Sequence, residues 1–179
     1  MSNNSSLQQL AQWAQSKINA LYEHPDTSLP DDNSAPPIAS RVQSLFAPTA
    51  QIYLNHTGPV PPEEFSKQLE KSFGTSRAEV EWKECFEVLD DNEHDAESET
   101  VGIVAGYFII TRTLKFRIRA APAKNYTHVS FSAKISNNPD LVQTSEKSIG
   151  DRDTRQIVQL FYTSMSKPAP VHIQGLHRT

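Results

Sequence analysis

Two side chains in the first third of the chain have the chemistry needed for proton transfer or carbonyl polarisation. Tyr53 and His56 lie in one short segment. A histidine can donate or accept a proton near neutral pH, and a phenol can donate a hydrogen bond to a carbonyl oxygen. We predict these two as candidate catalytic residues. The alternative for His56 is a surface position in a turn, because Gly58 and Pro59 follow it.

Aromatic side chains are the second group that could serve a binding site. An aromatic pocket suits an apolar or aromatic small molecule. The predicted ligand pocket consists of Trp13, Tyr53, Asn55, Trp82, Phe86 and Tyr107. The alternative is that most of these rings pack in the core. Tyr107 and Phe108 are neighbours in a strand and point to opposite faces, so at most one of them faces the pocket.

The other reactive side chains do not form a metal or nucleophile motif. Cys85 is expected to share a strand face with Glu81 and Glu87, and two nearby carboxylates oppose formation of a thiolate. His94 lies in an acidic segment, where a single histidine is more often solvated than bound to a metal. The sequence has no phosphate-binding glycine loop, serine elbow or dinucleotide fingerprint. We therefore predict no metal and no cofactor.

Composition limits the class of protein. The 179 residues are 37% hydrophobic and 21% charged, which is typical of an ordinary globular domain. The net charge is -4 with no cluster of Lys or Arg, which argues against nucleic acid and anionic membrane surfaces as partners. No apolar run approaches the ~20 residues of a membrane span. The N-terminal segment lacks the parts of a secretory signal and there is one cysteine, so we expect a cytoplasmic protein.

Three helices are predicted in the first half of the chain. Apolar residues recur at helical spacing from Leu7, and Pro25 ends this helix near His24. A short second helix covers 38–46, and a third runs over 62–73. Between the last two helices, residues 50–55 form a short strand that a turn over 56–59 follows.

After residue 77 the period of the apolar residues changes to two, which predicts strands. The expected strands cover 77–88, 100–113 with a continuation to 119, 126–136 and 155–165. One face of the first strand is expected to carry Val80, Trp82, Glu84, Phe86 and Val88. In the third strand His128 alternates with Val129 and Phe131, so we expect His128 to face away from the helices.

This order of elements predicts an α+β protein, with three N-terminal helices packed on a curved, mainly antiparallel sheet. Gly102 and Gly106 share a strand face with Phe108 and are expected to mark a bend in the sheet. We expect a single domain over 7–165, a flexible tail over 1–6 and a second tail over 166–179.

The segment Leu45-Phe46-Ala47-Pro48-Thr49-Ala50-Gln51-Ile52, followed by Gly58 and the helix over 62–73, resembles the nuclear-transport-factor-2-like superfamily. This superfamily includes SnoaL-like polyketide cyclases, ketosteroid isomerases and scytalone dehydratases. In element order the resemblance covers residues 7–165. It implies a cone-shaped fold with a deep pocket at its open end, and a homodimer formed through the outer face of the sheet.

The resemblance leaves two functions open. The first is a SnoaL-like protein that binds an apolar or aromatic small molecule, as a cofactor-free isomerase, cyclase or dehydratase. The superfamily's isomerases use a carboxylate after the short strand and a tyrosine in the first helix. This chain instead has Asn55 and His56 after the strand, and Lys17 at the nearest helix position, with Tyr22 a turn further on. The second is a non-catalytic dimeric interaction module that binds a protein or peptide, and a cone filled by side chains favours it.

Overall fold

The computed structural model describes residues 9–22, 37–73, 77–89, 100–118, 121–138 and 153–170. The helices are α1 (Leu10–Tyr22), α2 (Ile38–Leu45) and α3 (Pro62–Phe73). The strands are β1 (Phe46–Leu54), β2 (Thr57–Val60), β3 (Arg77–Leu89), β4 (Thr100–Ile118), β5 (Ala121–Asn137) and β6 (Arg155–Pro168). The predicted α+β class is confirmed. The predicted tail over 1–6, the last residues of the tail over 166–179 and His94 lie outside the described residues.

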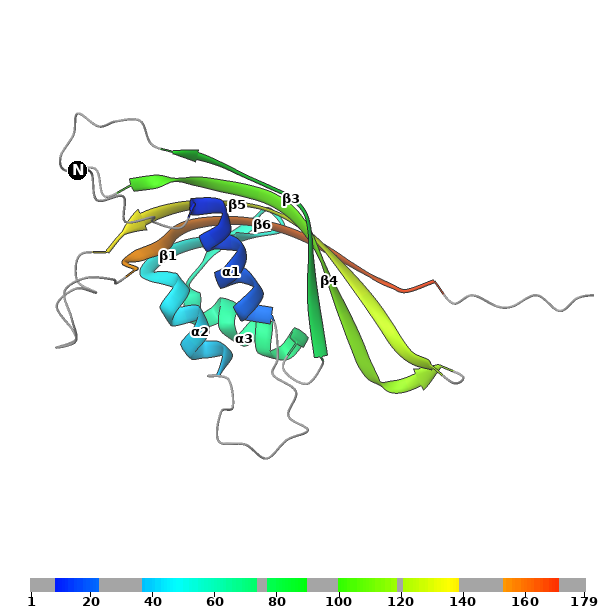
Figure 1. Ribbon diagram of the computed structural model, residues 1–179. Helices are drawn as coiled ribbons and strands as arrows, with labels where there is room; N and C mark the ends of the chain where they lie inside the picture. The colour runs from blue at the N-terminus through cyan, green and yellow to red at the C-terminus, as the bar shows by residue number, and fades with distance from the viewer. Residues whose placement is uncertain are drawn as a thin grey trace, which may run out of the picture.

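The strands form one sheet in the order β2-β1-β6-β5-β4-β3. Every neighbouring pair is antiparallel except β1 and β6, which run parallel. The sheet is curved, and the three helices lie together on its concave side (Figure 1). We call the side of the sheet that faces the helices the inner face, and the opposite side the outer face.

The core fills the space between the helices and the inner face. Each helix has one apolar side, because its apolar residues recur at helical spacing. The buried apolar residues of the helices are Leu10, Trp13, Ala14, Ile18, Leu21, Tyr22, Ile38, Val42, Leu45, Phe65 and Leu69. They pack against inner-face residues that include Val104, Phe108, Ile110, Val129, Phe131 and Ile135. Glu63 and Glu64 occupy the first turn of α3, where the helix dipole favours negative charge.

The turn predicted over 56–59 is displaced, because Thr57–Val60 forms strand β2 and pairs with β1. The turn itself is Asn55-His56, with φ of 48° and 65°. Two successive residues with positive φ suit the two-residue loop of a β-hairpin. A Cβ at Gly58, where φ is 123°, would lie 2.8 Å from the Ile52 carbonyl oxygen, so the hairpin requires glycine there. Strand β1 also begins earlier than predicted, at Phe46, and β6 continues past the predicted end of the domain to Pro168.

The predicted face of β3 is wrong beyond Trp82. Trp82 lies opposite Phe108 and Glu84 lies opposite Tyr107, so Lys83 has no partner on β4. An extra residue of this kind is a β-bulge, and it exchanges the two faces for all residues that follow. Phe86 and the following Val88 therefore lie on the outer face, where they are 58% and 62% exposed.

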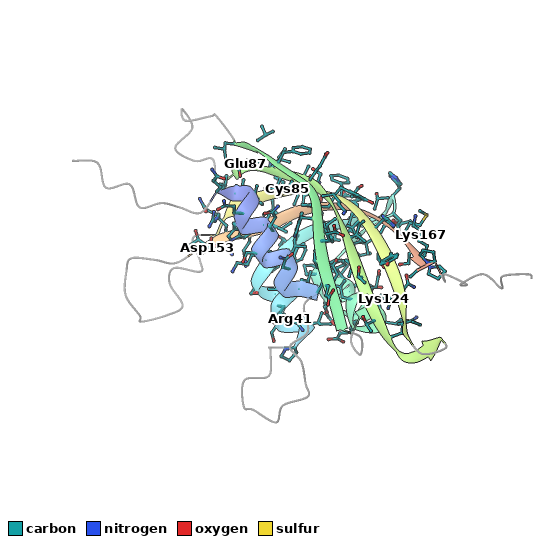
Figure 2. The ribbon with its side chains drawn as sticks, turned by 45° about the vertical axis from the view of Figure 1, so that its right-hand side comes forward. Arg41, Cys85, Glu87, Lys124, Asp153 and Lys167 are labelled. Atoms are coloured by element: carbon teal, nitrogen blue, oxygen red, sulfur yellow. The ribbon has the colours of Figure 1, made fainter. Side chains whose placement is uncertain are left out.

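The same bulge brings Cys85 and Glu87 to the inner face, beside the N-terminal end of α1 (Figure 2). The Glu87 carboxylate accepts a hydrogen bond from the Ala11 backbone N–H at 2.5 Å. The first turn of α1 has no acidic residue of its own, so β3 supplies the capping acceptor. Burial raises the pKa of the Cys85 thiol, and the charge of Glu87 raises it further. Cys85 is therefore protonated and unreactive at neutral pH.

Candidate functional site

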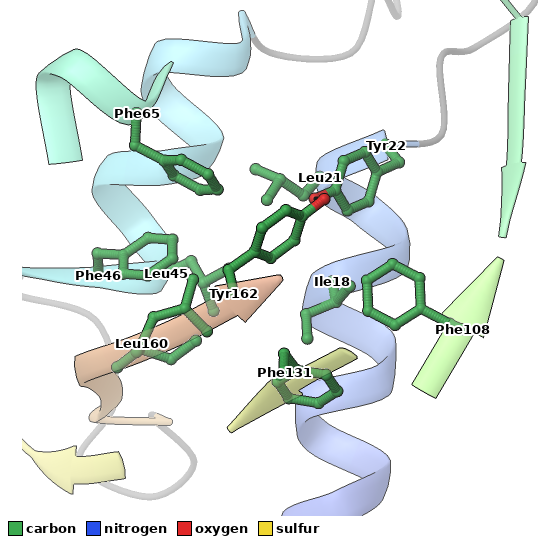
Figure 3. Close-up of a pocket in the computed structure, with 11 residues that line it drawn as sticks. Ile18, Leu21, Tyr22, Leu45, Phe46, Phe65, Phe108, Phe131, Leu160 and Tyr162 are labelled. Atoms are coloured by element: carbon green, nitrogen blue, oxygen red, sulfur yellow. Dashed lines mark hydrogen bonds between the residues drawn. The ribbon is translucent and has the colours of Figure 1, made fainter. Parts of the chain in front are cut away.

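The interior of the cone is filled by side chains. A cavity of about 20 Å³ remains between the helices and the sheet. Its lining is almost entirely apolar and aromatic (Figure 3) and consists of Ile18, Leu21, Tyr22, Leu45, Phe46, Phe65, Phe108, Phe131, Ile157, Leu160 and Tyr162. A volume of this size holds about one water molecule. Pockets that bind small molecules are typically about 300–1,000 Å³.

Aromatic rings account for this close packing. The Phe108 ring centroid lies 4.7 Å from that of Trp82, 5.8 Å from that of Phe131 and 6.0 Å from that of Tyr22. Phe65 makes an edge contact with Phe46 at 5.6 Å. These rings come from helices α1 and α3 and from four strands, so residues from both layers fill the centre of the cone.

Two tyrosine hydroxyls meet at the centre of the cone. The Tyr22 hydroxyl donates a hydrogen bond to the Tyr162 hydroxyl at 3.0 Å (Figure 3). Burial raises the pKa of Tyr22 well above its ordinary value and raises the pKa of Tyr162 to about 12. Both phenols are therefore neutral at physiological pH. Their bond satisfies buried polar groups that would otherwise destabilise the core.

None of the six residues of the predicted ligand pocket lines this cavity. Trp13 is buried in the core, with the Arg155 guanidinium 5.3 Å from its ring centroid. Trp82 is partly buried and donates its Nε1–H to the Asn19 side chain at 2.7 Å. Tyr53, Phe86 and Tyr107 lie on the outer face, and Asn55 lies at the hairpin turn.

The two candidate catalytic residues lie in different surroundings. The Tyr53 ring stacks on Phe161 with centroids 4.7 Å apart, on the face that points away from the helices. His56 is exposed in the β1–β2 turn. Tyr53 and His56 both lie outside the residues that line the cavity, so the structure does not bring them to one pocket.

The outer face carries large apolar side chains, of which five are exposed and Tyr53 is half-buried. We call the following set the outer apolar surface: Tyr53, Phe86, Val88, Ile103, Phe161 and Met165. Phe161 is 50% exposed and Met165 is 63% exposed. Sequence reasoning did not identify these two residues as functional, although their alternation with the buried Leu160 and Tyr162 is a readable signal.

Three residues of this surface, Tyr53, Phe161 and Phe86, belong to one row of paired residues that crosses five strands. Tyr53 pairs with Phe161, Phe161 with Ser132, Ser132 with Ala105, and Ala105 with Phe86. Directly paired residues point to the same face of a sheet. Aromatic rings therefore stand at both ends of the row, and two small residues lie between them.

Charged and polar groups surround the row. The exposed carboxylates of Glu79, Glu81 and Glu84 lie along β3. Lys134 and Lys167 lie on β5 and β6, on the other half of the face. In the middle, the Tyr107 hydroxyl and His128 Nδ1 are 2.5 Å apart. His128 faces away from the helices, as the alternation predicted.

A second, more polar space lies at the mouth of the cone. This mouth cleft has a volume of about 180 Å³ and lies between α3 and residues of β1, β4, β5 and β6. Its lining consists of Leu54, Asn55, Phe65, Gln68, Leu69, Ser72, Arg112, Thr127, Tyr162, Ser164 and Ser166. Among the predicted pocket residues, Asn55 alone contributes to it.

The described residues hold no group of three or more His, Cys, Asp or Glu side chains arranged to bind a metal ion. Among the helices described here, none combines the length and the apolar character that crossing a membrane requires.

Known structures share this architecture at low sequence identity. No family model matches the sequence, and a search of curated proteins finds no match. A chain in the crystal structure of the C. albicans Mtr2–Mex67 M domain complex is similar, with a TM-score of 0.53 and 12% identity. The similarity covers 91% of this chain and 98% of that chain. The crystal structure of Candida albicans Mtr2 gives a TM-score of 0.49 at 16% identity, with the same coverage. Three helices on a curved six-stranded sheet, together with the first of these similarities, show that the chain has the nuclear-transport-factor-2-like fold.

Proposed function

We propose that this chain is a non-catalytic interaction module that docks the outer face of its sheet on a second protein. One observation carries the proposal: the cone leaves a cavity of about 20 Å³ and a cleft of about 180 Å³, both smaller than typical ligand pockets, while the same sheet exposes large apolar side chains on its opposite face. A small-molecule enzyme of this fold needs the reverse arrangement. It needs an open interior and has no requirement for apolar residues outside.

Apolar side chains that lie next to one another on the surface are the first feature that favours docking. Single exposed apolar residues are normal on protein surfaces, whereas contiguous ones mark interaction sites. Tyr53 pairs directly with Phe161, and Val88 pairs directly with Ile103, so these apolar side chains are neighbours on the outer face. Ser132 is the polar member of the row between Phe161 and Ala105. Aromatic residues are also the type most enriched at the centres of protein interfaces.

The shape of the row is the second feature that favours docking. Ser132 and Ala105 lie between the rings of Phe161 and Phe86, so the centre of the row is lower than its ends. Strands lie about 4.8 Å apart, so the low part spans on the order of 10 Å. This trough suits a bulky apolar ridge on the partner. Basic residues of the partner would complement Glu79, Glu81 and Glu84 beside it.

A different protein fits the row better than a second copy of this chain does. The sequence predicts a homodimer through this face, and that prediction is untested by a single chain. A two-fold axis through the middle of the row would place trough against trough and leave Ser132 and Ala105 unfilled. The layout therefore favours a different protein that carries a ridge. The similarity to a chain from a complex of two different proteins, Mtr2 and the Mex67 M domain, supports this choice.

A photo-crosslinking experiment in cells of the source organism tests the proposal. The photoreactive residue p-benzoylphenylalanine replaces Phe161 in one variant and the exposed helix residue Lys67 in a matched control. A protein crosslinked from Phe161 but not from Lys67 is identified by mass spectrometry. It is then purified and mixed with the wild-type chain and with the Phe161→Glu variant in sedimentation velocity.

The expected result is a one-to-one complex that forms with the wild type and is lost in Phe161→Glu. Crosslinks between two copies of this chain, with a dimer in sedimentation of the chain alone, would overturn the choice of a different partner in favour of the predicted homodimer. Equal crosslinking from Phe161 and Lys67, or a complex that survives Phe161→Glu, would overturn docking through the outer face.

A further inference from the structure

The two edge strands of the sheet differ in how readily another strand could pair with them. β2 has four residues, Thr57–Val60, and one of them is Pro59, which has no backbone N–H to donate. Short length and proline are features that keep an edge from accepting a further strand. β3 has 13 residues, Arg77–Leu89, with no proline and no glycine, and it is the last strand beyond β4 (Figure 1). Of the two edges, β3 is therefore the one suited to accept a strand.

The backbone of β3 has hydrogen-bonding groups on the side away from β4. In an antiparallel pair, alternate residues direct their N–H and C=O groups to the partner strand, and the residues between them direct theirs outward. β3 pairs with β4 from Arg77 to Leu89 apart from Lys83, and within the described residues no strand pairs with its other side. The occupant that satisfies such a row of donors and acceptors is an extended chain that adds to the sheet as a further strand.

The C-terminal half of this edge is apolar. Phe86 and Val88 are exposed on the outer face, where Val88 pairs with the exposed Ile103 of β4. Leu89 follows Val88 and lies on the opposite face, yet it is 54% exposed. A strand placed alongside would cover these side chains, because directly paired side chains lie next to each other. This half therefore selects apolar residues in the added strand.

The charge of the edge is predominantly negative. Glu81 and Glu84 are exposed outer-face residues that precede the apolar half, and Lys83 between them forms an ion pair with Glu81. Over 78–89 the strand carries four glutamates and this one lysine. A second copy of this chain would bring its own glutamates to the same edge, and like charges placed opposite each other are destabilising. The charge therefore favours a basic segment of another protein.

We propose that the edge of β3 binds an extended segment of another protein, which adds to the sheet as an antiparallel strand. Antiparallel pairing is slightly more stable per residue than parallel pairing. From the N-terminal side of the segment, alternate residues meet four outer-face residues in turn: Val88, Phe86, Glu84 and Glu81. The segment therefore reads apolar, apolar, basic, basic at every second position. Backbone hydrogen bonds at the edge hold it, so the proposal does not depend on docking of the outer apolar surface.

Titration of the full chain with two peptides, followed by NMR spectroscopy, tests this site. The peptide acetyl-TVTFTKTKT-amide has the expected pattern, and acetyl-TVTFTETET-amide is its charge-reversed control. We expect saturable binding of the first peptide with slower hydrogen exchange at every second amide of β3, and binding of the control that is weaker by about fivefold or more. Slow exchange of all β3 amides in the free chain would overturn the proposal, because the edge would already be covered. If dilution of the free chain restores fast exchange, the cover is a second copy.

A charge reversal on the chain locates the binding. Glu84→Lys is expected to reverse the preference, so that acetyl-TVTFTETET-amide binds better than acetyl-TVTFTKTKT-amide. Glu70→Lys makes the same change at an exposed position on α3 and is expected to keep the wild-type preference. No saturable binding to the wild type, equal binding of the two peptides, or an unchanged preference in Glu84→Lys would overturn the proposal. The Phe161→Glu variant changes a residue of β6, three strands from β3, and is expected to bind the peptide normally, so failure of the docking proposal remains separate.

Discussion

The inner and outer faces of this sheet are built from the same strands but have different surroundings. On the inner face, Phe108 and Phe131 are buried under the chain's own helices. On the outer face, Phe161 and Phe86 belong to the same class of residue and are half or more exposed. An apolar side chain on a strand can therefore serve the fold or serve recognition, and only its cover distinguishes the two roles. The outer row is therefore the part of the sheet that the described helices leave uncovered.

The largest expected effect is on the inner face. Phe108→Ala removes a ring that contacts Tyr22, Trp82 and Phe131, and it should lower the free energy of unfolding by about 3–5 kcal/mol. Met165→Ala on the outer face is the control and should change this free energy by about 0.5 kcal/mol or less. Urea denaturation measures both variants. Similar losses in the two variants would remove the distinction between the faces.

The next effect concerns the bulge in β3. A Cβ at Gly106 would lie 2.5 Å from the Glu84 carbonyl oxygen and 3.1 Å from Phe131 Cε1. Gly106→Ala should therefore lower the free energy of unfolding by about 1–3 kcal/mol, since the backbone at the bulge cannot move away cheaply. Ser132→Ala, on the outer face, should be nearly neutral. A stable Gly106→Ala variant with wild-type urea unfolding would show that the bulge has room to relax.

The tyrosine pair at the centre of the cone makes the inner face sensitive to alkaline pH. The pKa of Tyr162 is raised to about 12, above the ordinary value of about 10 that it has in the unfolded chain. A raised pKa contributes stability that is complete below about pH 10 and is lost as pH rises towards 12. The loss should reach on the order of 2 kcal/mol at about pH 12. Urea denaturation at about pH 9 and about pH 12 measures it.

A double variant, Tyr22→Phe with Tyr162→Phe, is the control for that prediction. It should lose less stability over the same pH interval, because neither ring can ionise. Tyr53→Phe, on the outer face, should behave like the wild type. An equal alkaline loss in the double variant would assign the effect to other groups.

The smallest effect on stability is expected where the effect on docking is greatest. Phe161→Glu places a charge in the outer apolar surface, and because the side chain is half exposed the free energy of unfolding should change by only about 0.5 kcal/mol. Gln43→Glu makes the same change in charge on α2 and should preserve the complex that Phe161→Glu abolishes. A strongly destabilised Phe161→Glu variant would indicate that Phe161 serves the fold.

The faces of the strands show which features of the structure can be predicted from the sequence. His128, Val129 and Phe131 alternate without interruption in β5, and their predicted faces are correct. Phe86 was placed on the wrong face because one unpaired residue, Lys83, interrupts the pairing of β3 with β4, and no residue type marks that position. Strand β2 was missed because Gly58 and Pro59 are typical of turns.

The predicted ligand pocket rests on the resemblance to a superfamily and not on a pattern in this sequence. The predicted pocket was inferred from the cone of the resembling superfamily, but whether a cone is open depends on the volumes of all the side chains inside it. Phe108, Phe131 and Tyr162 fill that volume together, although they lie on three different strands. The mouth cleft arises from Ser164 and Ser166, which read as ordinary polar strand residues until the position of α3 is known.

The parallel pairing of β1 with β6 has a consequence for how the protein is made. Gln51 and Gln159 are register partners across this pair, although they are 108 positions apart in the chain. Contacts between distant segments slow folding, because a long loop must close before they form. During synthesis β1 leaves the ribosome well before β6 is made. Until then the edge of β1 has no strand to pair with, and the apolar Ile52 lacks its neighbour Leu160. The nascent chain therefore passes through a stage with an open strand edge, which is the kind of surface that molecular chaperones protect.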